Sequence, residues 1–162
     1  MRLIAVRSVG AHLCVRPIAV RNGGWAMEVP DYRSCVDRVA EWMAAEAGLV
    51  PGKTLFLGPA PREGPDGCAA IFEAGGRWDP GRGEQSWRVG IEARGRTAEA
   101  ARALAMACLS GALRGFETAS AEERGIILDL RVSELPSLEG CDGHGRESVR
   151  AALEMTIHAP AA

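Results

Sequence analysis

The sequence predicts an α+β domain in which two main helices pack on one face of an antiparallel or mixed sheet of about four to five strands. Two segments repeat apolar residues at the three- and four-residue spacing of a helix, and three segments alternate apolar and polar residues as half-buried strands do. These segments follow in the order helix, two or three strands, helix, two strands. That order favours helices gathered on one side of a sheet.

Composition is that of an ordinary globular protein. The chain has 162 residues, 47% of them hydrophobic and 25% charged, which suits one domain with a sizeable core. Its formal net charge of −2 provides no overall basic field of the kind that nucleic-acid-binding proteins carry. No apolar run approaches the roughly 20 residues that span a bilayer, so we expect no membrane segment. The five cysteines are odd in number and widely spaced, which favours reduced thiols and a cytosolic origin.

Residues 1–29 are expected to form an N-terminal arm or leader, separate from a single domain over residues 30–162. Residues 3–6 and 13–15 have strand-like composition, but both runs are short. One interpretation is an arm that reaches a neighbouring subunit. The others are a mobile leader, or an upstream start with Met27 as the usual first residue.

The first predicted helix covers residues 31–47. Asp31 is its candidate N-cap, because a carboxylate can accept hydrogen bonds from the amides of the first turn. Gly48 provides a left-handed end, and Pro51 prevents the helix from resuming. The apolar face is formed by Val36, Val39, Ala40, Met43 and Ala47.

Two short strands are predicted next, at residues 54–57 and 69–72, on either side of a stretch of turn-forming residues at 58–67. A second irregular segment is expected at residues 75–84. The strand after it should place Trp87, Val89, Ile91 and Ala93 on one face and Arg88, Glu92 and Arg94 on the other.

A second helix is predicted over residues 97–115, with Thr97 as its N-cap. Small residues dominate its apolar stripe, which would let a sheet approach closely. Two more alternating strands follow. One should direct Ile126, Leu128, Leu130 and Val132 to one face, and the other should do the same with Val149, Ala151, Leu153, Met155 and Ile157.

No motif predicts catalysis, a cofactor or a bound metal. Gly52-Lys53-Thr54 resembles the end of a phosphate-binding loop, but the preceding glycine is missing and the flanking elements stand in the wrong order. Cys141 and His144 have the spacing of half a zinc site. Structural zinc needs four ligands, and only His12 with Cys14, or His158, could complete the set after folding. We therefore expect a protein that is not an enzyme, with a small enzyme built on the Cys141 loop as an alternative.

A nucleic-acid-binding module is a further alternative. Its positive surface could be formed by Arg88, Arg94 and Arg96, or by Arg131 and Arg150. Carboxylates share those strand faces, and no series of aromatic residues accompanies the arginines as in single-strand binders.

Several segments after Met27 share their order with a known family. They are the amphipathic first helix, Pro65-Asp66 with the strand ending Ile71-Phe72-Glu73-Ala74-Gly75-Gly76, the strand at residues 87–94 before an alanine-rich helix, and a loop at residues 135–146. In this order the sequence resembles the siphophage minor capsid and tail-terminator proteins, a family that also occurs in gene transfer agents. Glu139, between Leu138 and Gly140, departs from the family's Leu-Gly pair.

The resemblance implies a structural virion protein, a subunit of a hexameric ring that ends the tail tube and joins it to the head connector. Its implied partners are copies of itself, the tail tube protein and a head-completion or connector protein, with DNA passing through the ring without sequence-specific binding. The implied location is the tail–head junction, after synthesis in the cytoplasm of a bacterial host. A head-closure or connector subunit is the near alternative.

Five residues are candidates for the subunit interface. Arg94, Asp142 and Arg146 could form ion pairs either between subunits or within the chain, where they would hold a loop in place. The full set is Arg88, Arg94, Arg96, Asp142 and Arg146. As exposed pairs they would contribute only about 0–1 kcal/mol each, so their value would lie in orientation.

Overall fold

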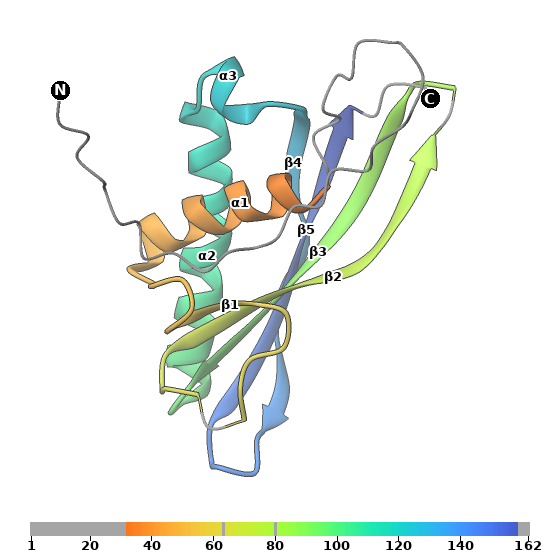
Figure 1. The fold of residues 1–162 in the computed structure, drawn as a ribbon. Helices are drawn as coiled ribbons and strands as arrows, with labels where there is room; N and C mark the ends of the chain where they lie inside the picture. The colour runs from red at the N-terminus through yellow and green to blue at the C-terminus, as the bar shows by residue number, and fades with distance from the viewer. Residues whose placement is uncertain (1–31, 63, 80, 159–162) are drawn as a thin grey trace, which may run out of the picture.

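The computed structural model describes residues 32–62, 64–79 and 81–158, which form a five-stranded mixed sheet with its helices packed against it (Figure 1). The predicted α+β class is confirmed. The predicted arm at residues 1–29 and the candidate cap Asp31 lie outside the described residues. In chain order the elements are α1 (Tyr32–Ala47), β1 (Leu55–Leu57), β2 (Cys68–Asp79), β3 (Glu84–Gly95), α2 (Ala98–Thr118), α3 (Ala121–Arg124), β4 (Ile127–Cys141) and β5 (Glu147–His158).

The strands lie side by side in the order β1-β2-β3-β5-β4. Only β1 and β2 are parallel, and the other neighbours are antiparallel. The two central strands, β3 and β5, pair along their whole length, from Glu84 opposite His158 to Gly95 opposite Glu147. Because β1 pairs only with Ala69–Ile71, the rest of β2 forms one edge of the described sheet and β4 forms the other.

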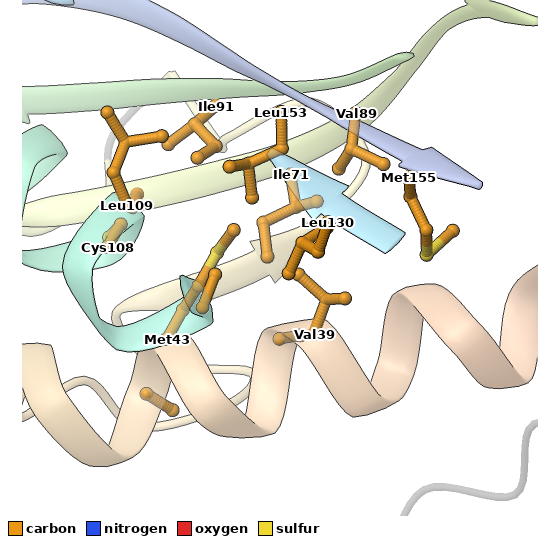
Figure 2. Packing of buried hydrophobic residues seen from close by; sticks show 14 of the residues in the cluster. Val39, Met43, Ile71, Val89, Ile91, Cys108, Leu109, Leu130, Leu153 and Met155 are labelled. Atoms are coloured by element: carbon orange, nitrogen blue, oxygen red, sulfur yellow. The ribbon is translucent and has the colours of Figure 1, made fainter. Parts of the chain in front are cut away.

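The core lies between the helices and one face of the sheet (Figure 2). Alternate residues of the central strands are fully buried there, as the period-two pattern predicts for β3 and β5. Each large aliphatic side chain buried in this way contributes about 1.5–3 kcal/mol before the entropy cost is counted. The labelled residues of this layer are Val39, Met43, Ile71, Val89, Ile91, Cys108, Leu109, Leu130, Leu153 and Met155.

Both predicted helices are present. Gly48, with φ of 65°, follows the last residue of α1 in the left-handed conformation expected of it. The Thr97 hydroxyl accepts a hydrogen bond from the backbone N–H of Ala100 at 3.1 Å, which confirms Thr97 as the N-cap of α2.

The end of α2 was predicted wrongly, because the helix continues past Gly115 to Thr118. Gly115 does not end the helix but lies where α1 crosses it. A Cβ atom on Gly115 would stand 2.2 Å from Cγ of Trp42, and one on Gly111 would stand 2.8 Å from the Trp42 carbonyl oxygen. The two glycines are therefore a packing surface that lets the helix backbones approach closely.

The expected irregular segment at residues 75–84 is also wrong, since most of it belongs to a hairpin. Strand β2 continues to Asp79 and β3 begins at Glu84. A register shift between Glu73 and Gly76, with Gly75 at φ of 110°, accommodates the glycine pair within the strand. Glycines that would otherwise indicate a turn here form a bulge.

Strand β4 departs from the prediction at both ends. It runs to Cys141, so the expected loop at residues 135–146 shrinks to a turn over residues 142–146. At its start a register shift between Ile127 and Asp129 interrupts the predicted alternation, although Leu130 is buried and Ile126 and Val132 pack against the core as predicted. Ile127 is buried, whereas Leu128 is 50% exposed, because a bulge adds one residue and changes which side chains face the core.

Candidate functional site

The sheet face opposite the helices, here called the open face, carries a lattice of ion pairs. Three of the pairs join residues of β3, β4 and β5 that are far apart in sequence, and the fourth joins two residues of β3. They are Arg88 with Glu134, Arg131 with Glu154 at 2.8 Å, Arg150 with Glu139 at 2.9 Å, and Arg94 with Glu92 at 2.7 Å. Most are solvent-exposed, so each stabilises the fold by only about 0–1 kcal/mol while restricting the orientation of both side chains.

An aromatic ring interrupts this polar lattice. Phe72 of β2 lies over Gly90 of β3, where a Cβ atom would come within 2.5 Å of the ring. The guanidinium carbon of Arg150 is 5.4 Å from the ring centroid, within cation–π range. Ala152, the partner of Gly90 on β5, is only 2% exposed although it points to the open face. Gly90 and Ala152, at the centre of the open face, are therefore buried.

At one end of the open face, the loop of residues 58–67 folds over the sheet. Cys68 points to the open face, opposite Arg94, yet it is fully buried. A Cβ atom on Gly64 of the loop would lie 3.7 Å from the Cys68 sulfur, so the loop is what covers this thiol.

Three arginines hold this loop, and we call Arg94, Arg96 and Arg146 the arginine clamp. Arg146 is only 5% exposed and donates hydrogen bonds to the carbonyl oxygens of Arg62 and Gly64. Arg94 donates to the carbonyl of Pro61 at 3.2 Å, and Arg96 to the carboxylate of Asp66 at 2.6 Å. The loop carbonyls, which pair with no strand, thus obtain donors from the sheet and from the turn after β4.

The structure brings four of the five candidate interface residues together at this end: Arg94, Arg96, Asp142 and Arg146. Arg88 lies apart on the open face with Glu134. All five have ion-pair partners within the chain. For Arg94, Asp142 and Arg146 this is the loop-holding arrangement that the sequence left open beside contacts between subunits. Their contact with another subunit stays a prediction. The sequence did not reveal that the loop carbonyls accept these hydrogen bonds. Every residue has a backbone carbonyl, so the residue type does not indicate which carbonyls accept from a side chain.

The turn after β4 is organised by Asp142. One carboxylate oxygen accepts the backbone N–H groups of His144 at 2.9 Å and Arg146 at 3.0 Å. The other accepts Nε of Arg146 at 2.7 Å. These donors, the backbone N–H of Arg146 foremost, lower the pKa of Asp142 from 3.8 to about 2.

The lowered pKa predicts an acid-dependent loss of stability that Asp142→Asn should reduce. A depressed carboxyl pKa stabilises the fold above the unfolded value of 3.8, and that contribution disappears as the pH falls to about 2. Thermal unfolding from pH 6 to pH 2 should show the Tm advantage of the wild type over the variant shrinking below pH 4. A constant difference over this range would contradict the assignment.

Neither cysteines nor histidines form a reactive arrangement in the described residues. Burial raises the pKa of the Cys68 thiol, and that of Cys108 to about 12, so both stay protonated. Cys141 is exposed, while His144 lies with Gly64, Asp66 and Arg146 around an open hollow of about 320 Å³. Within the described ranges, no group of three or more His, Cys, Asp or Glu residues could hold a metal ion.

Comparisons with protein families and with curated proteins add no relative. No protein-family model matches the chain, and no curated protein matches it in sequence. Among the described helices, none is long and apolar enough to cross a membrane. The fold and the site together define the chain as a small α+β domain with one helix-covered face and one ion-paired open face.

Proposed function

We propose that this chain is a non-enzymatic structural subunit of a virion, one copy of a ring that ends the tail tube and joins it to the head connector. The observation that carries the proposal is the open face, on which polar side chains are already oriented by ion pairs while the helices pack on the opposite face. The sequence resemblance to tail-terminator proteins supplies the particular assembly and its hexameric form.

A ring needs two different surfaces that meet head to tail. The two edges of the described sheet differ, since β1 and β2 form one edge and β4 forms the other. The open face is polar, as in proteins that fold alone before they assemble. These features support a subunit that folds by itself and then assembles head to tail into a ring.

The charge balance of the open face argues against a nucleic-acid-binding module. Carboxylates outnumber arginines there, and the paired arginines have no spare charge for phosphates. Binding of DNA should therefore be absent at physiological salt. The strand positions concerned are Arg77, Arg88, Arg94, Arg131 and Arg150 against Asp79, Glu84, Glu92, Asp129, Glu134, Glu139 and Glu154.

Deleting the gene and examining the resulting particles by electron microscopy tests the proposal. We expect tails of irregular length, or tails and heads that remain unjoined, with normal virions restored by a plasmid copy. Unjoined tails of regular length would favour a head-closure or connector subunit instead. Normal virions without the gene would refute both assignments.

A further inference from the structure

The hairpin of β2 and β3 carries a tryptophan whose side chain is mostly exposed to solvent. Trp78 is 60% exposed and is the one aromatic residue among the large exposed hydrophobic side chains of the described chain. It pairs with Gln85, in a row that continues to Ile157 and Ile127. Because Ile157 and Ile127 are buried in the core, Trp78 belongs to the helix-side face of the sheet.

The opposite face of the same hairpin is hollowed. Register shifts in β2, between Glu73 and Gly76, and in β4, between Val132 and Glu134, flank the hollow on either side. The hollow has a volume of about 410 Å³ and is open to solvent. It is lined by Ala74, Gly75, Gly76, Arg77, Ser86, Trp87, Arg88, Ser133 and Glu154.

We propose that Trp78 of one copy inserts into this hollow on the next copy. Gly75 has no side chain to exclude an indole, and nothing lies within 4 Å of the place that a Cβ atom on it would take. Arg77 and Arg88 line the hollow and can place guanidinium groups near the face of the indole. Tryptophan is also enriched among the residues that dominate protein interfaces. The partner in this contact is a second copy of this chain. Only the number of copies in the closed assembly depends on the ring proposed above.

The placement of the two features determines how copies would join. Trp78 and the hollow lie on opposite faces of the same strands, so a copy that inserts its Trp78 still presents an empty hollow, and the copy that receives it still presents a Trp78. Such a contact is heterologous, and repeating it leads to a closed ring when the rotation between copies permits closure.

Sedimentation velocity of the purified full chain over a concentration series tests the contact. Wild type should self-associate, and Trp78→Ala should weaken association at least about tenfold. Leu135→Ala is the matched control, because Leu135 is 70% exposed on β4 but does not line the hollow. Circular dichroism should show the same fold for all three. Equal association of wild type and Trp78→Ala, or a wild type that stays monomeric, would overturn the contact.

A mixing experiment separates this contact from other modes of association. Ser133→Trp should fill the hollow while leaving Trp78 intact, and alone it should associate as poorly as Trp78→Ala. Mixed together, the two variants retain one working contact, between Trp78 of the Ser133→Trp chain and the hollow of the Trp78→Ala chain. We expect one-to-one dimers that do not grow. Absence of dimers would refute the contact, whereas the ring function would still be judged by the particles of the gene deletion.

Discussion

Replacing Gly115 with alanine should destabilise the protein by about 2 kcal/mol, although alanine is the better helix former. The added methyl group would meet Cβ and Cγ of Trp42 at 2.5 and 2.2 Å. The Cβ atom is fixed to the backbone of α1 and does not move when the side chain rotates, so α1 and α2 must separate. The gain in helix propensity, about 0.5–1 kcal/mol, is smaller than the cost of overpacking.

Urea unfolding followed by circular dichroism measures this effect as a lower midpoint. Ser110→Ala is the matched control, since Ser110 is exposed on the same helix and adds no atom to the crossing. Its unfolding free energy should change by no more than about 0.5 kcal/mol. A Gly115→Ala variant as stable as the wild type would mean that the helices are not in close contact at this glycine.

Replacing Arg146 with methionine should cost on the order of 3 kcal/mol and release the loop of residues 58–67. The guanidinium is 5% exposed and supplies the donors for the carbonyls of Arg62 and Gly64. Methionine matches the length of the arginine stem but offers no donor, so both loop carbonyls would lose the hydrogen bonds that the buried guanidinium donates. Lysine should restore only part of the stability, because one ammonium group cannot reproduce the planar fork.

Arg131→Met provides the control for loss of an exposed arginine, since Arg131 pairs with Glu154 while its side chain is 64% exposed. It should change stability by less than about 1 kcal/mol. Hydrogen exchange should rise in the loop of residues 58–67 for Arg146→Met and stay unchanged for Arg131→Met. Unchanged exchange in the loop of the Arg146 variant would show that the clamp does not hold it.

The helices and the central strands were predictable because their signals are local. The N-cap at Thr97, the end of α1 at Gly48, and the buried alternation of Val89 and Ile91 depend on neighbours within a few residues. The errors in the strands fall where bulges occur, and the error in the end of α2 falls where α1 crosses it. Register shifts near Ile127 and Gly76 change the phase of a strand without changing its composition, so periodicity alone cannot locate them.

For the candidate site too, some features were predictable from the sequence and others were not. Sequence reasoning selected Arg94, Asp142 and Arg146, and the structure gives each a partner within the chain. It could not find that Arg146 reaches the carbonyls of Arg62 and Gly64, which are 84 and 82 residues away. The ion pairs of the open face are equally nonlocal, because they depend on which strands lie side by side.

By itself, the sequence determined the α+β class, the two main helices and the inward faces of the central strands, since each follows from hydrophobic periodicity within one segment. Only the tertiary structure decided that Gly111 and Gly115 form a helix crossing, that the loop of residues 58–67 is held by a buried arginine, and that the hairpin carries Trp78 opposite a hollow. These features depend on contacts between segments distant in the chain, and such contacts are established by packing rather than by local residue preference.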